Sequence, residues 1–337
     1  LYMTYRDEGL LIEEPDMRRI LARLGNAGGM VMVHAEDNDM AEASIPGFIE
    51  RGQTAPIYHA ESKPPAVENR AMERCIEMVR DTVADGNRAR LFIVHMTTAE
   101  GVEMVGVARG QGLDVTAETC MHYLVFTDEM LRREDGIKWI CSPPLRDLRA
   151  RDTLWEALRD GRVAQVTSDD AAYNWEATCY GQDRFDLCPN GMPGIEPRFQ
   201  VLYSEGVAKG RISLPRFVEL IATNPARIFG MQGKGELLPG FDADIVLLDP
   251  TERWTMGQDN SHSPNDWHAY EGLAITGKIR QVFSRGELII DGSLALGLMD
   301  DVVYDNVDCI LDQNTSLLMY TDGVSEAFNR DKQQYGE

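Results

Sequence analysis

The sequence predicts an α/β fold: an incomplete (β/α)8 TIM-type barrel followed by part of a small β-sandwich. Two observations predict it. Four short apolar runs, each preceded by a helical pattern, divide residues 1 to about 230, and a His or Asp side chain comes within two residues of the end of three of these runs. After residue 232 the helical patterns give way to short strands separated by glycine-marked turns.

The four units follow one another in regular order. In the first, apolar residues at helical spacing over 15–25 precede a buried strand at 30–33, which ends at His34. The remaining units pair a helix at 71–83 with a strand at 91–94, a helix at 98–109 with a strand at 113–116, and a helix at 153–158 with a strand at 163–167. Near-continuous apolar strands separated by helices predict a parallel sheet covered on both faces.

Four units make only half of such a barrel. A complete barrel has eight strands in about 250 residues, with catalytic groups at the carboxyl ends of the strands. Beyond it, a strand is expected near 245–249 and a hairpin at 278–290, turning at Ser284-Arg285-Gly286. We expect three domains: a half-barrel at 1–232, a partial β-sandwich at 233–293 and an acidic segment at 294–337.

Charge and composition narrow the function. The net charge is −22, and such an acidic protein repels nucleic acid and anionic membranes. No apolar run approaches the roughly 20 residues of a membrane span, and the first residues do not form a signal peptide. The six cysteines include no CxxC pair and are expected to be reduced thiols, which predicts a cytoplasmic location.

His34, His95 and Asp169 are the candidate metal ligands, because side chains at the carboxyl ends of parallel strands converge on one mouth. Two imidazoles and a carboxylate suit a divalent ion such as Zn²⁺, and the carboxylate could instead take a proton from metal-bound water. A single His at such a position is more often a core residue bonded to backbone, but three matching strand-end positions favour the metal. His122 could line the mouth or serve packing, His59 is expected to be structural, and His262 and His268 are expected to be solvated.

Several blocks in the same order resemble the dihydropyrimidinase and D-hydantoinase group of cyclic amidohydrolases. They are Val33-His34-Ala35-Glu36, Glu118-Thr119-Cys120, Ser142-Pro143-Pro144-Leu145-Arg146, Thr167-Ser168-Asp169, Asn190-Gly191-Met192-Pro193-Gly194 and Gly240-Phe241-Asp242-Ala243-Asp244. The resemblance covers residues 1–292. It implies hydrolysis of a small cyclic amide, such as a dihydropyrimidine or hydantoin, between two divalent ions, usually zinc, and a homo-oligomer in the intact family.

The resemblance also implies roles for individual residues. His34 and His95 match two ligands of the second metal, and Asp169 matches a ligand of the first metal that is also the general base. Tyr5 matches the donor to the tetrahedral oxyanion, and Ser142 and Asn190 match positions that hold the amide groups of the ring.

The chain departs from that group in two ways. The family's His-x-His pair and its bridging carboxylated lysine are not found, and the alignment would place the lysine directly before Leu1. We therefore expect a chain truncated at its N-terminus and inactive as it stands. In addition, Asp170 stands where hydantoinases usually have His, which affects the expected choice of substrate.

The end of the chain resembles a different family. Residues from about 294, including Thr321-Asp322-Gly323, resemble a SpoIIE-type serine phosphatase of the PPM class, in which this Asp binds metal. Two alternatives to the amidohydrolase therefore stay open. One is a non-enzymatic scaffold of the collapsin-response-mediator kind, and the other is a PPM-type phosphatase fragment.

Overall fold

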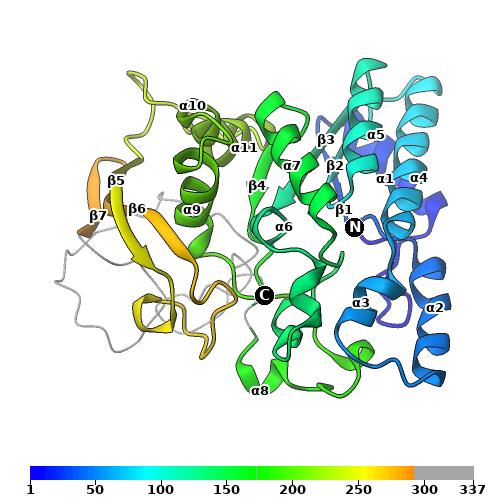
Figure 1. Cartoon of the computed structure of the whole chain (residues 1–337). Helices are drawn as coiled ribbons and strands as arrows, with labels where there is room; N and C mark the ends of the chain where they lie inside the picture. The colour runs from blue at the N-terminus through cyan, green and yellow to red at the C-terminus, as the bar shows by residue number, and fades with distance from the viewer. Residues whose placement is uncertain (172, 292–337) are drawn as a thin grey trace, which may run out of the picture.

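The computed structural model describes residues 1–171 and 173–291, and helices and strands alternate through its first part (Figure 1). The strands are β1 (Val31–Val33), β2 (Arg90–Ile93), β3 (Asp114–Cys120), β4 (Gln165–Thr167), β5 (Ile245–Thr255), β6 (Ala274–Ser284) and β7 (Glu287–Asp291). The helices are α1 (Glu14–Asn26), α2 (Asn38–Glu50), α3 (Ile57–Ser62), α4 (Pro65–Ala84), α5 (Ala99–Gly110), α6 (Met121–Val125), α7 (Leu148–Asp160), α8 (Trp175–Thr178), α9 (Pro197–Leu202), α10 (Leu214–Val218) and α11 (Asn224–Ile228). Single 3-10 or π turns lie at Asp128–Arg132, Gly136–Trp139, Phe185–Leu187, Tyr203–Ala208, Glu219–Thr223 and Gln258–Asn260.

The first four strands form one parallel sheet in the order β1-β2-β3-β4, which confirms the predicted α/β fold. Val33 pairs with Ile93, and Cys120 pairs with Thr167. The N-terminal residues lie beside β1, because the Leu1 amino group donates to the Met32 carbonyl at 2.7 Å and Tyr2 forms a parallel bridge with His34. Since all these segments run in the same direction, their carboxyl ends share one edge of the sheet.

Helices α1, α4 and α5 pack against one face of this sheet, and α7 packs beside α5. The hydrophobic core lies between the two layers, where Leu21 and Met72 from the helices meet Leu91 and Ile93 from β2. The other face borders an open pocket, and Met32 on that side of β1 remains 39% exposed. The expectation that both faces are covered is therefore wrong for this part of the sheet.

Local sequence signals explain where these helices begin and end. The Thr98 hydroxyl accepts a hydrogen bond from the Gly101 amide at the start of α5, and the Asp147 carboxylate caps α7 at Ala150. Helix α7 ends at Gly161, whose φ of 88° is a left-handed conformation that glycine adopts without steric cost.

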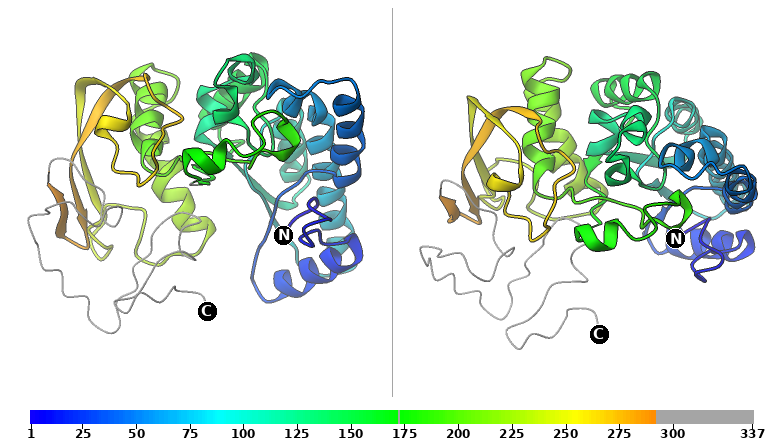
Figure 2. Two further views of the ribbon diagram at one scale, coloured as in Figure 1. Left: turned by 90° about the horizontal axis from the view of Figure 1, so that it is seen from below. Right: turned by 60° about the horizontal axis from the view of Figure 1, so that its bottom comes forward.

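A separate antiparallel sheet is formed by β5, β6 and β7 and packs beside α9 (Figure 2). The predicted hairpin is present: β6 and β7 turn at Arg285 and Gly286, both at positive φ, as a tight two-residue turn requires. We propose the boundary after residue 232 as the division between the two units. The third expected domain, 294–337, lies outside the described residues.

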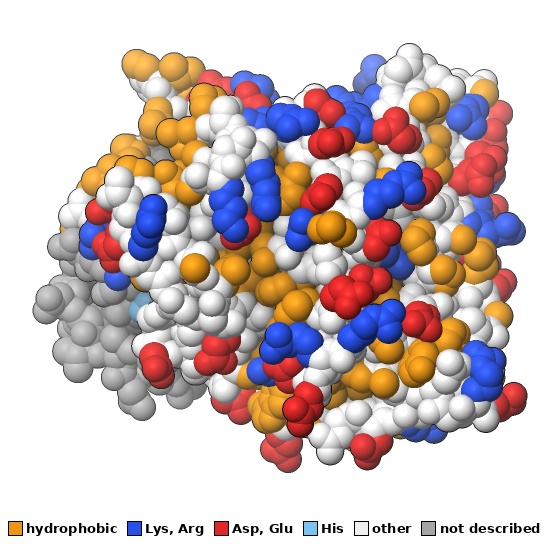
Figure 3. Space-filling view, viewed as in Figure 1, with side chains coloured by type: hydrophobic (Ala, Val, Ile, Leu, Met, Phe, Trp, Pro, Cys, Tyr) orange, Lys and Arg blue, Asp and Glu red, His pale blue; other side chains and the backbone are white. Residues whose placement is uncertain are grey.

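The surface carries both signs of charge. On the face seen in Figure 3, acidic and basic side chains are interspersed over the helical layer. Within residues 1–171 and 173–291, no helix has both the length and the apolar character needed to cross a bilayer.

The junction between the two units predicts a specific sensitivity to substitution. Gly277 in β6 has a φ of +100°, and a Cβ there would lie 2.6 Å from Cδ1 of Tyr203. Gly277→Ala should lower the free energy of unfolding by about 1 kcal/mol for the backbone conformation and by about 1–3 kcal/mol more for displacing the ring. Urea denaturation measures this change.

Gly272→Ala is the matched control, because Gly272 has a φ of +83° but nothing within 4 Å of an added Cβ. It should lose only the backbone contribution. Equal losses in the two variants would show that Tyr203 does not hold the sheet in place.

Candidate active site at the carboxyl edge of the parallel sheet

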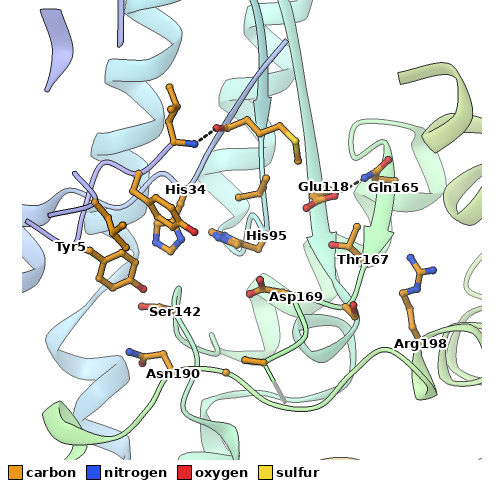
Figure 4. Close-up of a pocket in the computed structure, with 18 of the residues that line it drawn as sticks. Tyr5, His34, His95, Glu118, Ser142, Gln165, Thr167, Asp169, Asn190 and Arg198 are labelled. Atoms are coloured by element: carbon orange, nitrogen blue, oxygen red, sulfur yellow. Dashed lines mark hydrogen bonds between the residues drawn. The ribbon is translucent and has the colours of Figure 1, made fainter. Parts of the chain in front are cut away.

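A cavity of about 930 Å³ opens at the carboxyl edge of the parallel sheet. All six site residues expected from the sequence line it: Tyr5, His34, His95, Ser142, Asp169 and Asn190 (Figure 4). They come from six separate segments of the chain. The fold therefore brings the predicted residues together, although their chemical roles stay predictions.

Three of these residues hold unusual backbone conformations. Tyr5, His95 and Asp169 have φ values of 64°, 40° and 48°, and in the described residues the only other non-glycine residue at positive φ is Arg285 in the hairpin turn. Such conformations cost of order 1–3 kcal/mol each and concentrate at functional sites. All three side chains line the cavity.

The imidazoles of His34 and His95 lie edge to face with ring centroids 4.4 Å apart. The Nε2 of His34 is 2.7 Å from the Glu36 carboxylate, so its Nδ1 is the nitrogen left for a ligand. The Nδ1 of His95 is buried and has no hydrogen-bond partner. Burial, together with the neighbouring His34, holds the pKa of His95 well below its usual value, so this imidazole stays neutral.

Glu36 is part of a buried chain of polar groups that sequence reasoning missed. The Lys63 ammonium donates to the Ser142 hydroxyl at 2.8 Å, and that hydroxyl donates to Glu36 at 3.0 Å. Burial alone would raise the pKa of Glu36, but the Lys63 charge and the His34 hydrogen bond outweigh it and hold the pKa well below its usual range. Glu36 is therefore an anion that orients His34, and Lys63 balances its charge.

A signal for Glu36 was present in the sequence, because it stands two residues after His34. No signal marked Lys63, which lies in a proline-rich loop 79 residues from Ser142.

Tyr5 stands beside the imidazole pair, with its ring centroid 5.4 Å from that of His34. Its side chain and that of Ser142 point toward each other in Figure 4. Burial, reinforced by the negative charges of Glu36 and Asp169, raises the pKa of Tyr5 above its usual value despite a hydrogen bond with Ser142. The phenol therefore keeps its proton and can act as a donor.

The loop that carries Asn190 is held by the side chain of Asp170. The Oδ1 of Asp170 accepts from the Gly194 amide at 2.6 Å and from the Ile195 amide at 3.1 Å, so this carboxylate holds the loop. The Oδ1 of Asn190 is buried without a hydrogen-bond partner. A buried acceptor in this state is costly, which favours a ligand N–H opposite it.

The wall formed by the sheet supplies polar groups for which no role was predicted. Gln165 donates to Glu118 at 2.6 Å across the β3–β4 pair, and Thr167 and Arg198 also line the cavity (Figure 4). Glu118 and Gln165 are adjacent only because their strands pair, which a linear sequence pattern does not reveal.

The most compact cluster of metal-binding side chains is not the predicted one. Among the described residues, one group of three such side chains has ligand atoms within 4.8 Å of one another, and it consists of Cys120, His122 and Asp169. His34 and His95 share the cavity with Asp169 but lie outside that group.

The remaining histidines, His59, His262 and His268, differ in burial and in hydrogen-bond partner. His59 is buried, and its Nε2 is 2.8 Å from the Cys141 carbonyl, in agreement with a structural role. His268 is only 6% exposed and accepts from the Tyr270 amide through Nδ1, so the expectation that it is solvated is wrong. His262 is partly exposed and pairs with Glu196 at 2.6 Å. The five cysteines in the described residues are free thiols, as expected.

Comparison with known families agrees with this geometry. The model of the Amidohydrolase family matches residues 14–289, and the chain belongs to that family. The D-hydantoinase of Ralstonia pickettii is 40% identical over 301 residues, covering 88% of this chain and 64% of that protein. The D-hydantoinase of Rhizobium radiobacter is 39% identical, covering 89% of this chain and 65% of that protein. The chain thus spans slightly less than two thirds of the length of these relatives.

Solved structures show the same similarity. The dihydropyrimidinase of Brevibacillus agri matches with a TM-score of 0.83 and 36% identity, over 87% of this chain and 63% of that one. A D-hydantoinase crystal structure matches with a TM-score of 0.83 and 34% identity over the same shares. These solved structures have the TIM-barrel amidohydrolase fold, which confirms the fold class predicted for this chain.

A second family matches the end of the chain. The model of Stage II sporulation protein E covers residues 280–337, in agreement with the resemblance noted from the sequence. Most of this segment lies outside the described residues.

The buried state of His59 predicts how stability depends on pH. Burial, with the Lys63 charge, lowers the pKa of His59 to about 3, so the native protein leaves it neutral while the unfolded chain protonates it below about pH 6.5. His59 therefore contributes stability that is lost as the pH falls through this window, by about 1.4 kcal/mol per pH unit.

His59→Gln should remove that contribution and make the unfolding free energy less steep between about pH 6 and pH 4. Urea denaturation at a series of pH values measures the slope. Above about pH 8 both forms of the protein should show the same pH dependence, since His59 is neutral in both states there. An unchanged slope in acid would mean that His59 titrates normally in the native protein.

Proposed function

We propose that this chain carries the site of a metal-dependent hydrolase that opens a small cyclic amide, a dihydropyrimidine or hydantoin ring. The observation that carries the proposal is the convergence of Tyr5, His34, His95, Asp169 and Asn190 on one cavity at the carboxyl edge of the sheet. The names of the relatives, D-hydantoinase and dihydropyrimidinase, support the choice of substrate.

The two imidazoles fit a divalent metal ion. His34 is oriented by Glu36, and His95 offers a buried, neutral nitrogen that has no hydrogen-bond partner. Imidazole nitrogens and a carboxylate oxygen are ligands that Zn²⁺ accepts, so we propose zinc, held by His34, His95 and Asp169. When bound, such an ion lowers the pKa of water and polarises a carbonyl group.

The chain's own residues then account for the proton movements. We propose that Asp169 takes a proton from the attacking water while the water oxygen adds to the ring carbonyl carbon. Asp169 then gives this proton to the ring nitrogen as the C–N bond breaks. Tyr5, which keeps its phenolic proton, donates a hydrogen bond to the oxyanion formed in between.

The ring itself is held by the two loops that border the cavity. The unpaired Oδ1 of Asn190 accepts from a ring N–H. The Ser142 hydroxyl is already engaged with Lys63 and Glu36, so its contact with the ring falls to its backbone groups. We further propose a cytoplasmic enzyme that works as a homo-oligomer.

The 337 residues alone should show negligible ring opening of dihydrouracil or hydantoin with added Zn²⁺ or Mn²⁺. The physical reason is ligand number, because His34, His95 and Asp169 are too few for two ions and supply no anionic bridge between them. A chromatographic assay for the ring-opened acid measures this. Robust turnover by the unmodified chain would contradict the ligand count.

A fusion that places the N-terminal part of the Ralstonia pickettii D-hydantoinase ahead of Leu1 should restore turnover. The role of Asp169 can then be tested in this fused protein. In that protein Asp169→Asn should lower kcat at least 100-fold, as expected for loss of a general base. Asp170→Asn is the matched control, because its amide oxygen can still accept from Gly194 and Ile195. The proposal fails if the restored enzyme is indifferent to Asp169 or if both variants lose activity equally.

A further inference from the structure

A second group of metal-binding side chains lies where β3 and β4 end. Cys120 is the last residue of β3, His122 follows in the first turn of α6, and Asp169 comes two residues after β4. Cys120 pairs directly with Thr167, so strand register sets the thiol near the start of the Asp169 turn. One ligand atom of each side chain lies within 4.8 Å of the others.

The state of His122 points to a ligand. Its side chain is 1% exposed, and its contact with the Ser168 backbone falls short of a well-formed hydrogen bond at either ring nitrogen. A buried imidazole without a well-formed hydrogen bond is costly, and its ring packs against Tyr123 with centroids 4.1 Å apart, so it is held in place.

Cys120 is also fully buried, and its Sγ lies 3.4 Å from the Thr167 hydroxyl. Among the described residues, no Lys or Arg side chain forms a hydrogen bond with this thiol. A bound metal cation would therefore be needed to stabilise its thiolate form.

The donor set defines the class of ion. One sulfur, one imidazole nitrogen and one carboxylate oxygen suit Zn²⁺ and softer ions such as Cd²⁺, whereas Mg²⁺ and Ca²⁺ require oxygen ligands. Three protein ligands also leave the fourth tetrahedral position open.

We propose that Cys120, His122 and Asp169 form a binding site for one thiophilic divalent cation, distinct from the His34–His95 pair. An ion in this site uses the same carboxylate that the proposed reaction requires as its base. Occupation would therefore inhibit the enzyme at high zinc. That consequence rests on the proposed function, but binding itself does not.

The test uses the 337-residue chain and Co²⁺ as the probe, because a cobalt–thiolate bond gives a sulfur-to-metal charge-transfer absorption that nitrogen and oxygen ligands do not. The chain should show this band on titration. Cys120→Ser should abolish it, and His122→Gln and Asp169→Asn should each weaken binding about tenfold or more. Cys75→Ser, which removes a buried thiol elsewhere in the core, and His34→Gln should both retain the band.

A band that survives Cys120→Ser, or one that disappears with Cys75→Ser, would overturn the proposal. A measurement on the unsubstituted chain avoids reliance on variants: X-ray absorption of the zinc-saturated protein should show a sulfur neighbour of zinc at about 2.3 Å. A shell of nitrogen and oxygen alone would contradict it. Absence of ring opening in the fused enzyme would refute the proposed function while leaving these spectra unchanged.

Discussion

The parallel register of β1 to β4 is the constraint on which the site depends. Because Val33, Ile93, Cys120 and Thr167 end their strands at one edge, the residues that follow β1, β2 and β4 enter the same cavity. Helices on the opposite face hold this register through the apolar core. A slip of one residue in any strand would exchange core and cavity side chains, so packing and site geometry are specified by the same pairing.

The buried polar chain from Lys63 through Ser142 to Glu36 adds a second level of order. It fixes the orientation of His34, whereas strand pairing fixes only its position. Nearby, Glu68 accepts from Thr97 and pairs with Arg146, whose guanidinium also donates to the Lys63 carbonyl. Two buried acids are thus matched by two buried bases, and removing any one of them would leave an uncompensated charge in the interior.

The sequence predicted most of what depends on local pattern. Apolar runs located all four parallel strands, and the side chains that follow three of them lie in the cavity as expected. Long-range contacts could not be predicted in this way. Lys63 and Ser142 are 79 residues apart, Glu36 and Ser142 are 106 apart, and no periodicity links them. The prediction that His268 is exposed to solvent was wrong for a related reason. The sequence of a polar loop does not show which part of the protein the loop packs against.

The backbone of the site also limits how this protein can change. Tyr5, His95 and Asp169 each occupy a conformation that glycine adopts at no steric cost. Replacement by glycine would relieve the backbone at each position and erase the side chain that enters the cavity. Each position therefore combines a strained backbone with a side chain that glycine cannot supply, and the shape of the cavity depends on both.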